Sequence, residues 1–528
     1  MIHRNRLPGH ASSLLVSPVP GVSMSTEPSS RSSPALAFVA LTGLIGFTVV
    51  FAAHWWQSPP SSTIATPWLI FNGLMEFAGV FYSLSMLSIA VAFLLSDPHE
   101  SSNVQVPTIS QWPSVGIVYL CCDDVNRRAL HSLCQLRYPG ELHLVIHDDS
   151  TTADMRDLVD SIAAEIRDQF PGKVLLLRRT KKEWGKPGAT NYVLKETAHL
   201  YRYFVLCDND STPLSKDVVS KALSYFASPE VAIVQFRSTA IVPEGSSRVS
   251  SVLSQAIDVF DVFVATAPRW GWQPFLGHNA MISVSAFQAV GGLRPFFADD
   301  LDFALRLNLR GFRVVLASDI VFGEDHPHSY AAFRARTYKW AYGCTQIWKA
   351  HGWNILTSPT FSWSERWYLF VLIGFYPIQS LLLIYLFTAH VVMPVLAVPP
   401  SPNIWEILIA DALIILSVLA YTWAYFLKHQ QLRGYVGFAL LCSVIYGGTG
   451  LVSMRAIWDC LWGRKRRWIP TNGVQAVRRV NPGLLAEPLF SGLILCVPLI
   501  CSQMLPVSPL LFLFIGIYLV VPLVPKVY

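Results

Sequence analysis

The 528-residue chain is 52% hydrophobic and only 14% charged, whereas soluble domains have roughly 25% charged residues, which argues against a single soluble globule. Its net charge of +6 comes from 40 Lys and Arg against 34 Asp and Glu, a surplus too small to indicate a nucleic-acid-binding protein of this size. The nine cysteines are odd in number and form no C-x-x-C pair, so the sequence predicts neither a disulfide framework nor a zinc site.

The N-terminal part combines a polar leader with two apolar runs. Residues 1–33 are rich in Ser and Pro and predict a disordered cytoplasmic leader, with Met24 as an alternative start of translation. Residues 34–96 contain the apolar runs Pro34–Ala53 and Trp68–Leu95, which predict two transmembrane helices. The first run is too long for a cleaved signal peptide, so we expect it to remain as an anchor.

Residues 97–335 have the composition of a soluble α/β domain. Helix-like stretches such as Asp154–Gln169 and Lys216–Ala227 alternate with short β-like runs. The β-like runs are Val115–Leu120, Leu142–Ile146, Val174–Leu177, Tyr203–Leu206, Val231–Phe236 and Val314–Ala317. This alternation predicts an α/β sheet, much of it parallel, whose ligands would lie beyond the carboxyl ends of the strands.

The C-terminal part returns to membrane-like composition. Its apolar runs are Trp367–Phe387, Ile404–Leu427, Leu489–Leu505 and Ser508–Val524. They predict two transmembrane helices over 367–427, a cytoplasmic or interfacial segment over 428–488 and two transmembrane helices over 489–528. With the two N-terminal runs, the sequence predicts an α-helical bundle of about six spans into which the soluble domain is inserted.

A further apolar run, Tyr435–Met454, contains a cluster of glycines from Gly447 to Gly450 that weakens it as a lipid-facing helix. We expect it to be interfacial or re-entrant, and a seventh crossing is the alternative. Lys and Arg are retained on the cytoplasmic side of a membrane. The connections His54–Pro67 and Thr388–Asn403 contain neither residue, whereas Ser453–Pro488 contains seven. The sequence therefore predicts a multi-pass protein of the inner cell membrane whose soluble domain is cytoplasmic.

Paired acids follow two of the predicted strands. Asp148 and Asp149 come after the strand ending at Ile146, and Asp208 and Asp210 follow the strand ending at Leu206. Carboxylates this close repel one another unless a hard cation or hydrogen-bond donors neutralise them. Mg²⁺ and Mn²⁺ prefer oxygen ligands and often bind one or two carboxylates together with substrate phosphates. The pattern favours a metal site for a nucleoside diphosphate, and a solvated acidic turn that caps the next helix is the alternative.

Three more acids, Asp299, Asp300 and Asp302, begin a predicted helix. The helix dipole favours acids in a first turn, but three exceed what a cap needs, and a carboxylate is the usual general base for a sugar hydroxyl. A second feature is Lys186, which opens a helix at a Pro-Gly turn and could place an ammonium group on a phosphate.

In this order, the segments from about Ser114 to Asn472 resemble the family 2 glycosyltransferases, in particular the membrane-embedded processive branch that includes cellulose, hyaluronan and bacterial glucan synthases. The resemblance implies a GT-A-like fold for residues 97–335. It also implies nucleotide-sugar binding by a group of polar residues and catalysis by a general base. The implied nucleotide-sugar ligands are Asp124, Asp148, Asp149, Lys186 and Asp208, the metal ligands are Asp208 and Asp210, and the base is Asp300.

Three further segments carry the same resemblance. Arg336-Thr337-Tyr338-Lys339-Trp340 stands where the family has Q-x-x-R-W, on an interfacial amphipathic helix that would occupy 336–366. It implies diphosphate contacts from Arg336 and Lys339 and an acceptor platform at Trp340. The Gly277-His278-Asn279-Ala280 loop resembles that of bacterial glucan glucosyltransferases, which implies acceptor contacts from His278, Asn279 and Asp299. The run Arg464–Asn472 resembles a gating loop.

The resemblance implies an inverting transfer of a sugar from a UDP-sugar, best guessed as UDP-glucose, to a growing β-linked polysaccharide that is passed across the bilayer. Mg²⁺ or Mn²⁺ would be the cofactor, and an accessory export protein is a possible partner. Trp184, Trp272 and Trp340 are candidate sugar platforms. One alternative is single transfer to a lipid, as in the ceramide glucosyltransferase-like branch. An alternative of another class is a membrane transporter with a regulatory cytoplasmic domain.

Overall fold

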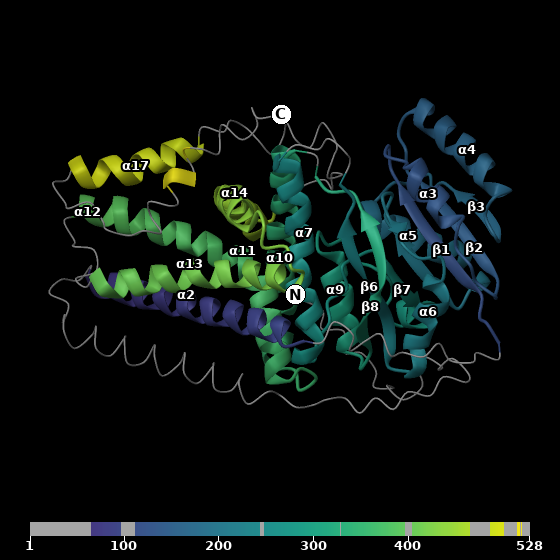
Figure 1. The fold of residues 1–528 in the computed structure, drawn as a ribbon, viewed down its shortest axis with the longest axis horizontal. Helices are drawn as coiled ribbons and strands as arrows, with labels where there is room; N and C mark the ends of the chain where they lie inside the picture. Colours follow the sequence, from purple (N-terminus) through teal and green to yellow (C-terminus); the bar gives the residue numbers. More distant parts are fainter. Residues whose placement is uncertain are drawn as a thin grey trace, which may run out of the picture. The chain divides into compact units, whose positions relative to one another are not determined.

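The computed structural model describes residues 65–96, 111–242, 248–327, 329–396, 404–464, 486–500, 515–517 and 519. The predicted leader, the apolar run Pro34–Ala53 and most of Arg464–Asn472 and Ser508–Val524 lie outside these ranges. The chain divides into two compact units (Figure 1). Within the described ranges, the first unit lies in Pro98–Thr239 and Trp272–Asp325. The second lies in Ser30–Asp97, Ala240–Gly271 and His326–Tyr528.

The first unit is built on an eight-stranded sheet with the order β3-β2-β1-β4-β7-β6-β8-β5. Its strands are β1 (Val115–Cys121), β2 (Leu142–Asp148), β3 (Lys173–Leu177), β4 (Tyr203–Cys207), β5 (Thr212–Pro213), β6 (Val231–Ala240), β7 (Ala280–Ser283) and β8 (Arg313–Glu324). Strands β3, β2, β1 and β4 are parallel, whereas β7 is antiparallel to both β4 and β6. All six predicted β-like runs are confirmed as strands, and β5 and β7 are additional.

The register of the parallel strands decides where the functional residues meet. Cys121 of β1 pairs with Asp148 of β2, and Tyr119 of β1 pairs with Cys207 of β4. The segments that follow these three strands therefore leave the sheet at the same edge. β1, β2 and β4 are buried along their whole length, as expected for near-continuous apolar strands that are covered on both faces.

The helices that cover this sheet are α3 (Arg127–Leu133), α4 (Ala153–Arg167), α5 (Gly185–Thr197), α6 (Val218–Ser224), α8 (Val284–Ala289) and α9 (Asp299–Asn308). α4 illustrates why they form. The Thr152 hydroxyl caps its first turn by accepting a hydrogen bond from the backbone N–H of Met155. Val159, Ile162, Ala163 and Ile166 then recur at helical spacing and are buried in the core under the sheet.

The second unit is helical. Its helices are α2 (Ala65–Leu94), α7 (Arg248–Trp270), α10 (Tyr330–Thr357), α11 (Trp363–Phe387), a π-helical turn (Thr388–Val392), α12 (Met393–Val395), α13 (Ile404–Lys428), α14 (Tyr435–Gly447), α15 (Gly450–Leu461) and α17 (Ala486–Ile500). In the described part of the chain, four helices are long and apolar enough to cross a membrane: Ile70–Leu94, Arg248–Trp270, Trp363–Val392 and Tyr435–Leu461.

Two of these four helices coincide with predicted spans, Trp68–Leu95 and Trp367–Phe387. The other two differ from the sequence analysis, which assigned α7 to the soluble domain and expected Tyr435–Met454 to be interfacial. α7 is a helix of mixed character, because it contains Asp258 and Asp261 near its middle and Arg248 and Arg269 near its ends. The total of about six spans stays a prediction.

The break between α14 and α15 is held by side chains of α10. The Tyr330 hydroxyl donates to the carbonyl of Ile445 at 3.2 Å, and Arg334 Nη1 donates to the carbonyl of Gly448 at 2.9 Å. Both side chains are buried. The carbonyl groups that a helix end leaves without intrahelical partners are thus satisfied from a neighbouring helix.

A half-buried lysine, Lys428, lies at the C-terminal end of α2. Lys428 Nζ donates to the carbonyls of Phe93 and Ser96, each at 2.6 Å, and to the Ser96 hydroxyl at 2.7 Å. A cation at a helix C-terminus is favoured by the helix dipole.

We expect Lys428→Met to cost about 1.5–3 kcal/mol, the usual contribution of hydrogen bonds made by a charged group. The thermal unfolding midpoint of the detergent-solubilised chain should fall accordingly. Lys195→Met, at an exposed lysine of α5, is the control. An equal midpoint for both variants would show that the Lys428 cap contributes nothing.

Candidate active site

The loop after β4 carries Asp208 and Asp210 and is braced on several sides. The Ser211 hydroxyl accepts from the N–H of Asp208 at 2.9 Å, and the Tyr119 hydroxyl donates to the carbonyl of Asn209 at 2.9 Å. The backbone N–H of Asp325 donates to Asp210 Oδ2 at 3.1 Å. These contacts fix the direction in which both carboxylates leave the strand end.

Lys186 meets this loop from the first turn of α5. Its ammonium group forms an ion pair with Asp208, and both side chains are partly buried. Burial alone would lower the pKa of Lys186, but the carboxylates of Asp208, Asp299 and Asp300 raise it above its ordinary value. The structure thus brings together lysine and three acids that are up to 114 positions apart in the sequence.

The acidic loop has the chemistry of a cation site. Burial, with the charges of Asp208 and Glu324, raises the pKa of Asp210 to about 7. Among the described residues, no group of three or more His, Cys, Asp or Glu side chains has the arrangement of a metal centre. Asp208 and Asp210 nevertheless fit Mg²⁺ or Mn²⁺, because such ions often bind one or two carboxylates and take their other ligands from water and substrate phosphates.

The His278 side chain lies between the carboxylates of Glu324 and Asp208. Its Nε2 is 2.6 Å from Glu324 Oε2 and its Nδ1 is 3.8 Å from Asp208 Oδ2. Burial alone would lower its pKa, but the charge of Glu324 raises it to about 9. Asn279, the next residue, is buried and donates to the Ser238 hydroxyl at 3.2 Å. Acceptor contacts from these two residues stay predictions.

The three acids of α9 have different surroundings. Asp302 is fully buried and forms ion pairs with Arg294 and Arg306. Asp300 instead packs against the backbone of Gly277, where an added Cβ atom would lie 3.3 Å from Asp300 Oδ2. Gly277 has a φ of +87°, which side-chain-bearing residues rarely adopt, so a glycine is required beside this carboxylate. Asp300 is therefore the acid of this turn that is placed at the Gly277–Ala280 loop.

Asp124 follows β1 and accepts a hydrogen bond from the N–H of Cys122 at 2.6 Å. Burial raises its pKa to about 6, and the charge of Asp208 contributes in the same direction. Asp124 also touches the acidic loop through its carbonyl, which accepts from the Asn209 amide at 2.8 Å. Its predicted contact with the nucleotide is untested.

Asp148 and Asp149 each accept a hydrogen bond from an arginine that the sequence alone did not reveal. Arg178 Nε donates to Asp148 Oδ2 at 2.7 Å, and Arg179 Nη2 donates to Asp149 Oδ2 at 2.6 Å. Burial alone would raise the pKa of Asp148, but hydrogen bonds from Ser150 and Arg178 hold it below its ordinary value. The neutralising cations thus come from the chain itself, and nucleotide binding by either acid stays a prediction. The consecutive arginines just beyond β3, which neighbours β2, are the signal that could have revealed this pairing.

The Arg336–Trp340 segment lies on α10 of the second unit. The Arg336 guanidinium stands over the Trp340 ring, 4.6 Å from its centroid, and the Trp340 side chain is 39% exposed. Acceptor and diphosphate contacts from Trp340, Arg336 and Lys339 stay predictions. Among the other candidate sugar platforms, Trp184 is 59% exposed. The prediction of Trp272 as a sugar platform is wrong, because its side chain is buried and its indole N–H donates to Asn308 at 3.0 Å.

Two family profiles and several curated proteins are similar to this chain in sequence. The profile of glycosyl transferase family 2 matches residues 114–291, and that of glycosyl transferase family group 2 matches residues 203–524. A beta-monoglucosyldiacylglycerol synthase from Synechocystis sp. is 29% identical over 251 residues, which cover 46% of this chain and 50% of that protein. The probable glucomannan 4-beta-mannosyltransferase 2 of Oryza sativa subsp. japonica is 24% identical over 253 residues, which cover 47% of this chain and 43% of that protein.

The chain thus spans about half the length of the curated relatives that it matches. Among solved structures, a mannosyltransferase from Pyrobaculum calidifontis in complex with GDP-mannose and Mn²⁺ aligns with a TM-score of 0.48 and 18% identity. The alignment covers 74% of this chain and all of that one. Because a single family profile covers more than half of the sequence, from residue 203 to residue 524, the chain belongs to glycosyl transferase family group 2.

Proposed function

We propose that this protein is a membrane-embedded glycosyltransferase that moves a sugar from a nucleoside diphosphate sugar, with UDP-glucose as the first donor to test, to the end of a growing β-linked glycan. The observation that carries the proposal is the convergence of Lys186, Asp208 and Asp300 at the carboxyl ends of the strands. In open α/β sheets this is where ligands bind. The position in the inner membrane and the cytoplasmic side of the first unit are part of the proposal.

Each of these residues has a role in the proposed reaction. Asp300 accepts the proton of the acceptor hydroxyl, whose oxygen bonds to the anomeric carbon as the bond from that carbon to the diphosphate oxygen breaks. Attack from the face opposite the diphosphate inverts the anomeric carbon. Lys186 donates to the diphosphate, which gains negative charge as it departs. When bound at Asp208 and Asp210, Mg²⁺ or Mn²⁺ supplies further positive charge for this leaving group.

Polar contacts inside the second unit support a glycan as the acceptor. Asn72 of α2 donates to Glu76 at 2.7 Å and accepts from the Tyr385 hydroxyl of α11 at 2.7 Å. Gln379 of α11 donates to the carbonyl of Tyr446 at 3.2 Å. Polar groups within apolar helices are costly and mark functional paths. They favour a hydrophilic passage through which the product would cross the bilayer, with or without an accessory export protein.

A lipid acceptor is the second candidate, because one relative is a beta-monoglucosyldiacylglycerol synthase. The size of the labelled product distinguishes a glycan acceptor from a lipid acceptor. Membranes that contain the purified chain should be incubated with Mg²⁺ or Mn²⁺ and radiolabelled UDP-glucose, UDP-N-acetylglucosamine or GDP-mannose. A long labelled polymer would support the proposal, a single labelled lipid would support the second candidate, and no nucleotide release from any donor would contradict both.

The metal part of the proposal has its own test. Chelation with EDTA is expected to abolish transfer, and Mg²⁺ or Mn²⁺ should restore it. Asp210→Asn should raise the metal concentration needed for half-maximal activity, because one of the two carboxylate ligands is lost. Full activity in EDTA would contradict the metal assignment while leaving the glycosyltransferase proposal in place.

A further inference from the structure

The turn that leads into α5 has a strained backbone. Trp184 and Gly185 both have positive φ angles, +64° and +51°. This region is unfavourable for a bulky residue such as Trp184, and such conformations persist only where the surrounding structure enforces them. Trp184 does not supply its own cap, because it makes no side-chain hydrogen bond to the first turn of α5. Another part of the protein must therefore hold this turn.

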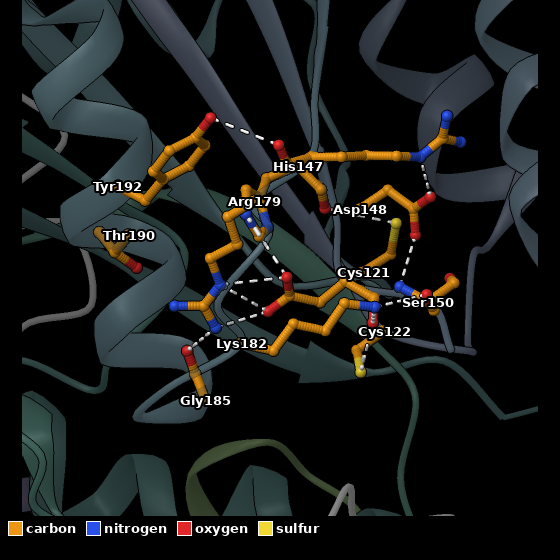
Figure 2. Close-up of polar contacts among 12 residues, drawn as sticks. Cys121, Cys122, His147, Asp148, Ser150, Arg179, Lys182, Gly185, Thr190 and Tyr192 are labelled. Carbon is orange, nitrogen blue, oxygen red and sulfur yellow. Dashed lines mark hydrogen bonds and ion pairs between the residues drawn. The ribbon is translucent and has the colours of Figure 1, made fainter. Parts of the chain in front are cut away.

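Arg179 is the residue that holds it (Figure 2). Its Nη1 donates to the carbonyl of Glu183 at 2.8 Å and its Nη2 donates to the carbonyl of Gly185 at 3.0 Å. These two carbonyls flank Trp184, so the guanidinium fixes the strained residue from both sides. Gly188 gives the turn the necessary space, because a Cβ atom there would overlap the Glu183 carbonyl and Arg179 Nη1.

Asp149 in turn orients Arg179. Arg179 Nε is 3.1 Å and 3.0 Å from the two Asp149 carboxylate oxygens, and Nη2 is 2.6 Å from Oδ2. The side chains of Arg179 and Asp149 are only 6% and 9% exposed. A planar guanidinium held by a carboxylate in this way keeps one orientation, which a lysine could not reproduce.

The turn has a direct connection to the proposed chemistry. Lys186 follows Gly185 and forms the ion pair with Asp208. Its ammonium position therefore depends on the backbone direction that Arg179 fixes. Lys182 fastens the beginning of the same turn to the end of β2, because its Nζ donates to the carbonyls of Asp149 and Ser150 at 2.6 Å each.

We propose that Asp149 and Arg179 form a positioning pair that holds the strained Trp184–Gly185 turn and thereby places Lys186 on Asp208. In this pair, Asp149 acts on the turn through Arg179. The contact of Lys186 with a diphosphate rests on the proposed function, whereas the holding of the turn does not.

Arg178 offers a matched control, because it is the neighbouring arginine and also neutralises a buried aspartate. It donates to Asp148 at 2.7 Å, to Asp160 at 3.2 Å and to the carbonyl of Arg156 at 3.0 Å, all outside the turn. The test compares Arg179→Lys with Arg178→Lys in the full-length protein. Both substitutions keep the charge and remove the planar fork.

The first readout is hydrogen exchange of the backbone amides of Gly185, Lys186 and Gly188, followed by mass spectrometry. Arg179→Lys is expected to raise their exchange rates by about tenfold or more, which is the order expected when a charge-assisted hydrogen bond is lost. Arg178→Lys should leave these rates near those of the unmodified protein. Equal rates in Arg179→Lys and the unmodified protein would overturn the proposal whatever the enzyme activity is.

The second readout is the dissociation constant of UDP in the presence of Mn²⁺. Arg179→Lys and Lys186→Gln should each weaken binding by about 10- to 100-fold, and the double variant should be no weaker than Lys186→Gln alone, because both changes remove one interaction. The effects of Arg178→Lys and Lys186→Gln should add. Additive effects of Arg179→Lys and Lys186→Gln would show that Arg179 does not act through Lys186.

Two outcomes separate the inference from the proposed function. Faster exchange in Arg179→Lys, with neither UDP nor GDP bound by the unmodified protein, would support the held turn and contradict the nucleotide-sugar proposal. If Arg179→Lys does not fold, Asp149→Asn replaces it with the same readouts, since it keeps the shape of the carboxylate and removes its charge. Unchanged exchange in Asp149→Asn would then overturn the pair.

Discussion

Replacing Asp300 with Asn is expected to slow sugar transfer by about 10²- to 10⁴-fold, the usual contribution of a general base, while UDP binding is retained. Asn keeps the size of the side chain and still accepts the hydrogen bond that Asp300 Oδ1 receives from the N–H of Leu301 at 2.8 Å, so the turn should survive. What disappears is the ability to take a proton. Initial rates with a radiolabelled donor, alongside UDP affinity, measure the two effects separately.

The contrast with a structural role makes this prediction specific. If Asp300→Asn retained more than about a tenth of the rate, Asp300 could not be the base, because the loss would fall below the range for general base catalysis. Loss of UDP binding together with activity would instead indicate that the acid supports the donor site.

Asp302→Asn, two residues further along the same helix, is expected to act on stability. Asp302 is fully buried and receives hydrogen bonds from Arg294 Nε at 3.0 Å and Arg306 Nε at 2.9 Å. Removing its charge leaves two arginines without their counter-ion, and breaking a buried ion pair in this way costs about 3–5 kcal/mol. The thermal unfolding midpoint of Asp302→Asn should therefore fall well below that of Asp300→Asn.

Arg306→Met tests the same ion-pair cluster by removing one of the two arginines that bind Asp302. Arg306 also donates to the carbonyls of Val290 and Gly292, each at 2.7 Å, so its loss should destabilise the segment before α9 as well. Equal midpoints for Asp302→Asn and the unmodified protein would refute the structural role of Asp302.

The sequence predicted the parts of the fold that local composition decides. All six apolar β-like runs are strands. β1, β2 and β4 are central and buried along their whole length, which requires apolar residues, whereas β3 is an edge strand and only partly buried. β5 and β7 escaped notice because they have two and four residues, too few for any periodicity. The interfacial expectation for Tyr435–Met454 rested on its glycines. Those glycines do mark a break between two helices, but the combined segment is long enough to cross a membrane.

The acidic residues of the candidate site could be predicted from the sequence, but most of the basic residues that pair with them could not. Motif order identified Asp208 and Asp300, whose neighbours in space include Lys186 as expected. Which acid of the α9 turn is buried depends on Arg294 and Arg306, and only the i, i+4 spacing of Asp302 and Arg306 hinted at it. The consecutive arginines after β3 were a signal for a partner of Asp149, but the choice of Arg179 depends on the alignment of β2 with β3, which the local sequence does not contain.

The hydrogen bonds from α10 to the break between α14 and α15 have a mechanical consequence. Tyr330 and Arg334 hold that break from the same helix that carries Trp340, ten and six residues before it. In an apolar environment, carbonyls that lose their donors cost several kcal/mol, on the order of the stability of a small domain. A translation or rotation of α10 that displaced Trp340 would thus either break these hydrogen bonds or move the adjoining ends of α14 and α15 with it. We therefore expect the three helices to move together.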